Sequence, residues 1–390
     1  MIPFEESVSI VMNSAITLEE ESVPLQEACG RVLYRDVSSD IDIPPFNKSA
    51  MDGYACRSED IGRPLKVIET IPAGYTPQKT VGDGECSKIM TGGIVPEGAD
   101  CVVMIEHTEI KDDLVIVNKK SSDRNICYKA EDIQKGDRVL QKGTLVTPAE
   151  IAVLASVGCD PVPVSRKPVL GIIATGNELV QPSQEPKSAQ IRNSNSYQLY
   201  SQIEQAGCKP VYLGIIEDSP EAIGAAIDQN ISNVDIFLLS GGVSMGEFDY
   251  VPGVLQEKGF RLLFQKVAIK PGKPTVFGKK ENKFVFGMPG NPVSTFIIFE
   301  MLVKPFCYKL MGANYSYKMV KAKLAETIKR KKSERLSFIP VVVNKNGEIG
   351  LVKYHGSAHI HSLTKANGIL SIPVGINEIK AGESVGVIFI

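Results

Sequence analysis

The spacing of apolar positions changes along this 390-residue chain, and each spacing predicts a different kind of structure. Near the N-terminus, apolar residues from Phe4 to Ile16 recur at roughly helical intervals, and residues 25–30 resemble a short helix closed by Gly30. Between about Asp40 and Lys142, short alternating apolar runs lie between glycine- and proline-rich turns, which is typical of a compact β unit.

From Pro168 to Met311, short and nearly continuous apolar runs alternate with amphipathic segments. The runs predict strands buried on both faces, and the alternation predicts a parallel sheet with helical crossovers. The expected strands cover residues 169–174, 211–216 and 235–239, and the expected helices cover residues 196–206, 220–231 and 250–258. Short apolar runs return after residue 312 and predict a small β domain.

The expected fold is therefore a multidomain α/β protein around a central, parallel, doubly wound domain. An elongated N-terminal α+β part with a β-rich insert precedes that domain, and a small C-terminal β-barrel follows it. The expected boundaries are 1–165 for the N-terminal region (with linker parts 1–39 and 143–165 around the insert 40–142), 166–311 for the α/β domain and 312–390 for the barrel.

Composition narrows the classes of function. Lys and Arg number 43 against 45 Asp and Glu, a net charge of −2, which argues against a nucleic-acid partner. The eight cysteines are scattered without a CxxC pair, and the N-terminus lacks the features of a signal peptide. The longest apolar stretch, 296–311, is interrupted by Glu300, Lys304 and Pro305, which predicts a buried helix. We expect reduced thiols, a cytoplasmic location and no membrane segment.

Carboxylates follow the predicted central strands. Glu178, Asp218 and Asp249 each come after a strand, so we expect them to meet at the carboxyl edge of the sheet. Three converging carboxylates repel one another, and a hard cation such as Mg²⁺, shared with a substrate phosphate, would relieve that repulsion. The alternative for Asp218 is a helix cap before Pro220.

Two glycine loops in the same region predict a phosphorylated ligand or a nucleotide. Each follows an apolar strand and precedes a helix, so its backbone can approach an anion closely. Neither matches the P-loop or the dinucleotide fingerprint. Their candidate binding residues are Gly241, Gly242, Ser244, Pro289, Gly290, Asn291 and Pro292.

A lysine-rich turn supplies positive charge. In an extended segment, Lys266 and Lys270 project from one face, and Lys273 follows a Pro-Gly turn. The three ammonium groups could bind an oxyanion, although single surface lysines are common. In the N-terminal half, Pro44–Ala55 and Ile89–Asp100 place hydroxyls and carboxylates beside glycines, which suits either ligand contact or plain tight turns.

Seven motifs in order resemble the molybdopterin molybdenumtransferase family, which comprises the MoeA proteins and the E domain of gephyrin. They are Pro44-Pro-Phe-Asn-Lys-Ser-Ala-Met-Asp-Gly-Tyr-Ala, Ile89-Met-Thr-Gly through Pro96-Glu-Gly-Ala-Asp, Glu131-Asp-Ile, Ala174-Thr-Gly-Asn-Glu-Leu, Ser240-Gly-Gly-Val-Ser-Met-Gly-Glu-Phe-Asp-Tyr, Ala268-Ile-Lys-Pro-Gly-Lys-Pro and Gly287-Met-Pro-Gly-Asn-Pro-Val-Ser. The C-terminal Arg335-Leu-Ser-Phe and His355-Gly-Ser fit as well, so the resemblance covers essentially the whole chain.

The resemblance implies an enzyme that inserts molybdate into adenylylated molybdopterin, with Mg²⁺-dependent release of AMP. It implies a homodimer whose site lies between subunits, and possibly a MogA-type adenylyltransferase acting upstream. The residues that it implies for the site are Asp52, Thr91, Asp132, Glu178, Asp218, Asp249, Lys266, Lys270, Lys273, Arg335 and Ser357.

Two positions depart from the family pattern. The stretch before Asp132 lacks an arginine-rich segment and carries Cys127, and Asn193 stands where aspartate is common. The enzyme alternative is a MogA-like adenylyltransferase, which shares the sheet domain alone. A non-catalytic scaffold is the alternative from a different class; the absence of a long linker in this chain speaks against it.

Overall fold

The central sheet forms where the sequence has its continuous apolar runs. The computed structural model describes residues 1–119, 121–243, 249–353 and 356–390. The sheet has the order β16-β13-β17-β21-β20-β18, and the first four strands are parallel. The strands are β16 (Lys209–Ile216), β13 (Val169–Thr175), β17 (Ile236–Ser240), β21 (Lys283–Met288), β20 (Val276–Lys280) and β18 (Arg261–Phe264). Strand β20 is antiparallel to both its neighbours, so the sheet is mixed at one edge.

Helices cover both faces of this sheet, as the doubly wound expectation requires. The helices on one face are α1 (Phe4–Asn13), α3 (Asn195–Gln205), α6 (Pro292–Ile298) and α7 (Lys304–Leu310), and those on the other are α4 (Pro220–Asn230) and α5 (Val251–Glu257). Neighbouring residues of β17 point to opposite cores, since Leu238 packs with the first set and Phe237 with the second. The π-helical segment Phe299–Val303 joins α6 to α7, which makes residues 292–310 one buried helical stretch.

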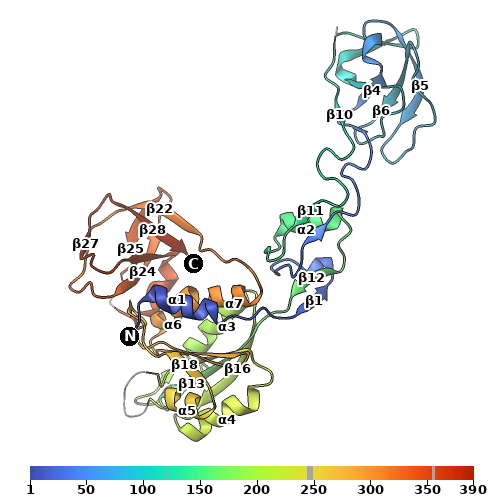
Figure 1. Ribbon diagram of the computed structural model, residues 1–390. Helices are drawn as coiled ribbons and strands as arrows, with labels where there is room; N and C mark the ends of the chain where they lie inside the picture. The colour runs from blue at the N-terminus through green and yellow to red at the C-terminus, as the bar shows by residue number, and fades with distance from the viewer. Residues whose placement is uncertain (120, 244–248, 354–355) are drawn as a thin grey trace.

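The C-terminal strands close into a five-stranded barrel. The ring runs β24-β25-β22-β28-β26 and closes because β24 pairs with both β25 and β26. Its strands are β22 (Met319–Leu324), β24 (Leu336–Val343), β25 (Glu348–Leu351), β26 (Gly368–Ile372) and β28 (Ser384–Phe389), with β23 (Ile328–Lys329) and β27 (Glu378–Ile379) paired beside them and the 3₁₀ segment Ile360–Lys365 between β25 and β26. The expected barrel is confirmed, and Figure 1 shows it beside the α/β unit.

The N-terminal part reaches away from both of these units (Figure 1). Its insert holds a six-stranded sheet in the order β7-β4-β6-β5-β9-β8. The strands are β4 (Gly53–Cys56), β5 (Leu65–Ile71), β6 (Glu85–Ile89), β7 (Cys101–Met104), β8 (Thr108–Lys111) and β9 (Leu114–Val117), with the 3₁₀ turns Ser58–Asp60 and Ile105–His107 and the short pair β3 (Lys48–Ser49) and β10 (Ile126–Cys127). The β-rich insert of the expected fold is confirmed.

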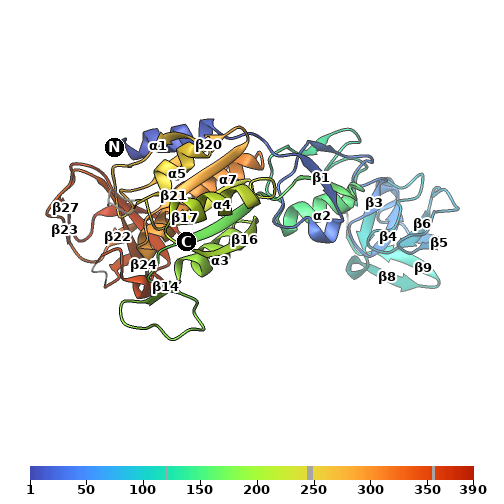
Figure 2. The same ribbon diagram turned by 90° about the horizontal axis from the view of Figure 1, so that it is seen from below.

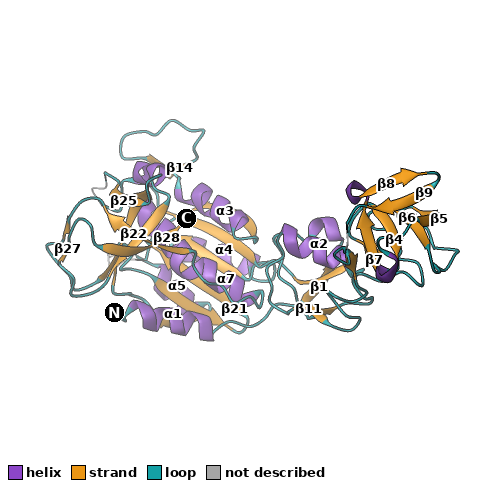
Figure 3. Ribbon diagram, turned by 90° about the horizontal axis from the view of Figure 1, so that it is seen from above, coloured by secondary structure: helices purple, strands orange, loops and turns teal. Residues whose placement is uncertain are grey.

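Short elements between the insert and the α/β unit form a small separate core (Figure 3). They are β1 (Glu20–Val23) paired with β12 (Val162–Ser165), β2 (Val37–Ser38) paired with β11 (Arg138–Leu140), and α2 (Pro148–Ser156). Thr147 caps α2 together with Glu150, as its sequence predicts. The helix expected at 25–30 is only the 3₁₀ turn Leu25–Glu27, because the chain turns at once into the bridge between Val32 and Leu145.

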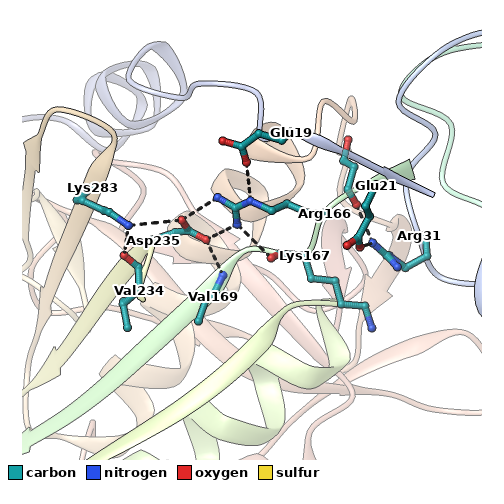
Figure 4. A network of polar contacts seen from close by, with 10 residues as sticks. Glu19, Glu21, Arg31, Arg166, Lys167, Val169, Val234, Asp235 and Lys283 are labelled. Carbon is teal, nitrogen blue, oxygen red and sulfur yellow. Dashed lines mark hydrogen bonds and ion pairs between the residues drawn. The ribbon is translucent and has the colours of Figure 1, made fainter. Parts of the chain in front are cut away.

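A network of ion pairs fixes this linker to the amino end of the central sheet (Figure 4). The Arg166 guanidinium donates to both carboxylate oxygens of Asp235, at 2.7 and 3.0 Å, and also to Glu19 at 2.5 Å. These hydrogen bonds raise the pKa of Arg166, with the Asp235 bond as the largest cause. Asp235 also accepts from the Val169 backbone N–H. The linker therefore joins the sheet at the edge opposite to the strand ends with the predicted site residues.

All eight cysteines are free thiols. The Cys56 and Cys101 sulfurs, on the paired strands β4 and β7, lie 3.6 Å apart and form a thiol–thiol hydrogen bond rather than a disulfide. Within the described residues, no helix is long and apolar enough to cross a membrane.

Candidate functional site

Four loops begin at the same level of the central sheet because its strands are parallel and in register. Thr175 pairs with Ile216, Ala174 pairs with Ser240, and Ser240 pairs with Met288. The loops that start at residues 175, 217, 240 and 289 therefore meet at one edge. This edge faces the barrel, whereas the amino edge faces the linker (Figure 2).

Asp218 is the carboxyl group at this edge whose pKa is raised. Burial raises its pKa most, and the charges of Asp249 and Glu178 raise it further. Its Oδ1 atom is buried and has no hydrogen-bond partner among the described residues. The three carboxylates that the sequence predicted are thus close enough to interact.

The cap alternative for Asp218 is not what this structure shows. The next residue, Ser219, caps α4 by accepting from the Ala222 N–H, while the Asp218 side chain lies free of that turn. The N-cap of α4 is therefore Ser219 and not Asp218, so the Asp218 carboxylate is available for other contacts.

The carboxylates do not form a preformed metal cage. Within the ranges that the structure describes, no group of three or more acidic, histidine or cysteine side chains converges closely enough to hold an ion. This agrees with the chemistry of Mg²⁺, which takes one or two carboxylates and completes its shell with water and phosphate oxygens. The orphaned Asp218 Oδ1 and its like-charged neighbours fit such a partial site.

The first glycine loop packs directly on the end of β13. A Cβ atom at Gly241 would lie 2.4 Å from the Thr175 carbonyl oxygen, and both Gly241 and Gly242 have positive φ angles of 105° and 64°. Only glycine fits there, because any side chain would clash and strain the backbone. Ser244, which the sequence predicted to bind the ligand in this loop, lies outside the described residues.

The second loop, 289–292, is anchored from two sides. The Thr295 hydroxyl donates to the Pro289 carbonyl at 2.7 Å, and the Asn195 amide donates to the Gly290 carbonyl at 2.8 Å. The predicted residues Asn291 and Pro292 lead into α6. The barrel touches this loop, since the Val293 N–H donates to the Ser357 carbonyl at 3.0 Å. Ser357 and the loop are therefore neighbours.

The lysine-rich turn joins the barrel to the α/β unit. Strand β19 (Ile269–Lys270) pairs with β24, so that Lys270 lies opposite Ser337. The Arg335 guanidinium donates to the Ile269 carbonyl at 3.1 Å, which brings Arg335 beside Lys270.

The chain reverses at the Pro-Gly turn of this segment. The Val267 N–H donates to the Lys273 carbonyl, and the Lys266 carbonyl accepts from the Ile2 N–H, each at 3.0 Å. Among the described residues, no ion pair links Lys266, Lys270 or Lys273 to a carboxylate. Their charges are therefore not neutralised by an ion pair within the described chain.

Asp52 and Thr91 form a pair of their own in the insert. The Thr91 N–H and hydroxyl both donate to Asp52 Oδ1, at 2.6 and 2.7 Å, and these bonds lower the Asp52 pKa. Asp132 is exposed and follows the short strand β10. The insert lies beyond the linker, on the side away from the carboxyl edge (Figure 2). One chain thus does not bring this pair to the other predicted residues.

The structure shows the surroundings of Asn193 and Cys127, the two positions that depart from the family pattern. Asn193 is buried, donates to the Ser196 hydroxyl and to the Tyr212 hydroxyl, and accepts from the Ser196 N–H. It therefore fastens the start of α3 to β16. Cys127 lies in β10, which pairs with Lys48 and Ser49.

Sequence reasoning missed two polar residues of this edge, Thr175 and Asn195. Both are buried, and Thr175 Oγ1 and Asn195 Oδ1 have no hydrogen-bond partner among the described residues. An unsatisfied buried polar atom costs about 1–3 kcal/mol, so two such atoms at this edge, in addition to Asp218 Oδ1, are unusual. Their signal in the sequence is their place in the motifs Ala174-Thr-Gly-Asn and Ile191-Arg-Asn-Ser-Asn.

The fold is that of a multidomain α/β protein in which the carboxyl edge of a mostly parallel sheet meets a C-terminal barrel through β19 and loop 289–292. Family models match the chain in three parts: the MoeA N-terminal region (domain I and II) over residues 2–158, a probable molybdopterin binding domain over 171–309, and the MoeA C-terminal region (domain IV) over 321–390.

Relatives match over the whole length. The chain is 35% identical to a molybdopterin molybdenumtransferase of Bacillus subtilis (strain 168), covering all of this chain and 94% of the relative, and 35% identical to that of a Staphylococcus epidermidis strain, covering 99% and 95%. The crystal structure of a molybdopterin biosynthesis MoeA protein from Pyrococcus horikoshii OT3 superposes with a TM-score of 0.88 at 34% identity over the full length of both chains. The chain belongs to the MoeA family of molybdopterin molybdenumtransferases.

Proposed function

We propose that this chain is a molybdopterin molybdenumtransferase, which inserts molybdate into adenylylated molybdopterin with Mg²⁺-dependent release of AMP. Full-length relatives that carry this name support the transferase. The observation that carries the site assignment is the orphaned Asp218 carboxylate oxygen, beside Glu178 and Asp249, at the carboxyl edge of the sheet.

In this proposal, cationic side chains bind molybdate and the backbone of the glycine loops binds the phosphates. Lys266, Lys270 and Lys273, with Arg335 alongside, supply positive charge for molybdate, a tetrahedral dianion. The loops at Gly241–Gly242 and 289–292 bring backbone close to the substrate's phosphates.

Mg²⁺ fits the acidic part of the site. Asp218, with Glu178 or Asp249, would hold it, and the bound ion would neutralise charge on the phosphoanhydride that breaks when AMP leaves. A cation there would also return the pKa of Asp218 toward its usual range, because it offsets the repulsion that raises it.

We further propose that the working form is a homodimer with a site between subunits. The insert, which carries the bonded pair Asp52 and Thr91, lies on the far side of the linker from the α/β unit of its own chain (Figure 1). A second chain can bring its insert to the carboxyl edge, since a twofold arrangement exchanges equivalent surfaces. The cytoplasm is the proposed location.

Turnover of the purified protein tests this function. The wild type is expected to release AMP from adenylylated molybdopterin only when molybdate and Mg²⁺ are both present. Asp218→Ala and Lys266→Ala are expected to fold normally and to lose at least about 100-fold in rate, as removal of an electrostatic catalytic group does. The measurement is AMP formed per enzyme by chromatography, with circular dichroism as the folding control.

The alternatives predict other outcomes. A MogA-like adenylyltransferase, the partner expected to act upstream, would form adenylylated molybdopterin from ATP and release no AMP from it. A non-catalytic scaffold would do neither. Full activity of both variants would refute the assignment of Asp218 and Lys266, while leaving the transferase itself standing.

A further inference from the structure

The amide of Asn195 sits between the two glycine loops at the carboxyl edge of the sheet. Asn195 is the first residue of α3 and is 9% exposed. Its Nδ2 donates to the Ser240 hydroxyl and to the Gly290 carbonyl, both at 2.8 Å. These two bonds tie the first loop, after β17, to the second loop, after β21.

The orientation of this amide is fixed by its partners. The Gly290 carbonyl can only accept, so the atom facing it must be Nδ2, and two bonds use both Nδ2 hydrogens. Asn195 Oδ1 must then face the other way as a pure acceptor. It is buried and has no donor within the described chain.

Two further unsatisfied oxygen atoms surround the same loop. A Cβ atom placed on Gly242 would lie 3.1 Å from Thr175 Oγ1 and 3.5 Å from Asp218 Oδ1, and neither oxygen has a hydrogen-bond partner among the described residues. Asn195 reaches this loop through its bond to Ser240. Three polar oxygens near loop 240–242 thus lack partners among the described residues. The Thr175 hydroxyl can donate or accept, but Asn195 Oδ1 can only accept, which points to a ligand that brings a donor to it.

Because Asn195 Oδ1 can only accept a hydrogen bond, it favours the portion of the proposed substrate that carries N–H donors. Phosphate oxygens and dithiolene sulfurs accept hydrogen bonds, so neither can satisfy an amide oxygen. Adenine offers one amino group among ring nitrogens that accept. The aminopyrimidinone ring of a pterin offers an amino group beside a ring N–H, which is a continuous donor edge.

We propose that Asn195 Oδ1 accepts a hydrogen bond from an N–H group of the pterin ring, which makes Asn195 a specificity-determining residue. This inference rests on the proposed function. In this division, Asn195 Oδ1 recognises the heterocycle, Asp218 serves the cation, and the lysines and Arg335 bind the oxyanion.

Binding of neopterin, a fluorescent aminopyrimidinone pteridine, tests the proposal, with AMP as the second ligand. Asn195→Ala removes the acceptor and the loop anchor together, and it is expected to bind neopterin about tenfold more weakly, with little change for AMP. Asn195→Asp loses the donor to Gly290 but keeps an oxygen at the Oδ1 position. Its neopterin affinity is expected to lie clearly above that of Asn195→Ala.

Thr295→Val is the matched control, because it removes an anchor of the second loop at Pro289 without removing an orphaned acceptor. Its affinities for neopterin and AMP are expected to change together. The inference is overturned if Asn195→Asp and Asn195→Ala are equally impaired, if AMP loses as much as neopterin, or if the wild type shows no saturable neopterin binding. AMP release by the wild type is measured separately, so a failed inference is distinguishable from a failed function.

Discussion

Two aspartates of the predicted site, Asp52 in the insert and Asp218 at the central sheet, have surroundings that shift their pKa values in opposite directions. Asp52 is exposed and receives two hydrogen bonds from Thr91, which lower its pKa. Asp218 is partly buried, lies near two other carboxylates and has an unpartnered oxygen, which raises its pKa.

The difference separates two kinds of functional group. The Asp52–Thr91 pair is satisfied by its own chain and is held in one geometry before any ligand arrives. Asp218, like Thr175 and Asn195 at the same edge, has an oxygen without a hydrogen-bond partner among the described residues, so a bound ligand or ion is expected to complete it. If both serve one reaction, the preformed pair must come to the incomplete edge from a second subunit.

Mixing two inactive variants gives the largest effect. Asp52→Ala and Asp218→Ala are each expected to be inactive, but a mixture that exchanges subunits is expected to regain about a quarter of wild-type activity, because half of the dimers then contain one intact site. AMP release after mixing and incubation measures it.

The double variant Asp52→Ala/Asp218→Ala is the control for the mixture. Mixed with either single variant, it cannot rebuild an intact site across subunits and should stay inactive. If the two single variants also stay inactive after proven subunit exchange, the two regions do not share a site between chains.

A pair of identical substitutions tests the incomplete edge through stability. Thr295→Val is expected to lower stability by about 1 kcal/mol, since it strands the Pro289 carbonyl. Thr175→Val removes a hydroxyl that has no partner among the described residues, so stability is expected to stay equal or rise. Thermal or urea unfolding without ligand measures both; equal losses would show that the Thr175 hydroxyl has a partner in the free protein.

The smallest effect is a difference in pH dependence. The raised pKa of Asp218 favours the folded state below about pH 3.8, and this contribution is lost as pH rises through the folded pKa. The lowered pKa of Asp52 stabilises above pH 3.8, and this contribution is lost as pH falls.

Near neutral pH, Asp218→Ala is therefore expected to be at least as stable as the wild type, and Asp52→Ala less stable. Both differences should shrink toward acid pH. Unfolding curves measured from about pH 3 to pH 7 check the signs, and identical profiles for the two variants would contradict the comparison.

Much of the fold could be predicted because its signals are local. The strand predicted at residues 169–174 is β13 at Val169–Thr175, and the helix predicted at 220–231 is α4 at Pro220–Asn230. Continuous apolar runs and a proline at the first turn act on neighbouring residues alone. The reversed strand β20 and the closure of the barrel through β24 and β26 depend on pairing between distant segments.

The sequence indicated which types of residue lie at the strand ends, but it did not indicate which contacts those residues make in three dimensions. The position of Asp218 at the carboxyl edge could be predicted, because parallel strands end at one edge; its role there stays a prediction. The unpartnered atoms of Thr175 and Asn195 were not foreseeable, since satisfaction depends on every neighbour in three dimensions. The assignments of Glu178, Asp249, the lysines and Ser244 remain predictions.

The sequence by itself determined the three-part architecture, the loops at the strand ends and the types of charge that they carry. The spacing of apolar residues and the residues that favour turns act locally, so they can be interpreted without knowing which distant segments pack together. Only the tertiary structure decided that the insert, with its Asp52–Thr91 pair, stands apart from the edge, and that three polar oxygens there lack partners within residues 1–119, 121–243, 249–353 and 356–390. Distance and desolvation are set by packing, and packing is a property of the whole molecule.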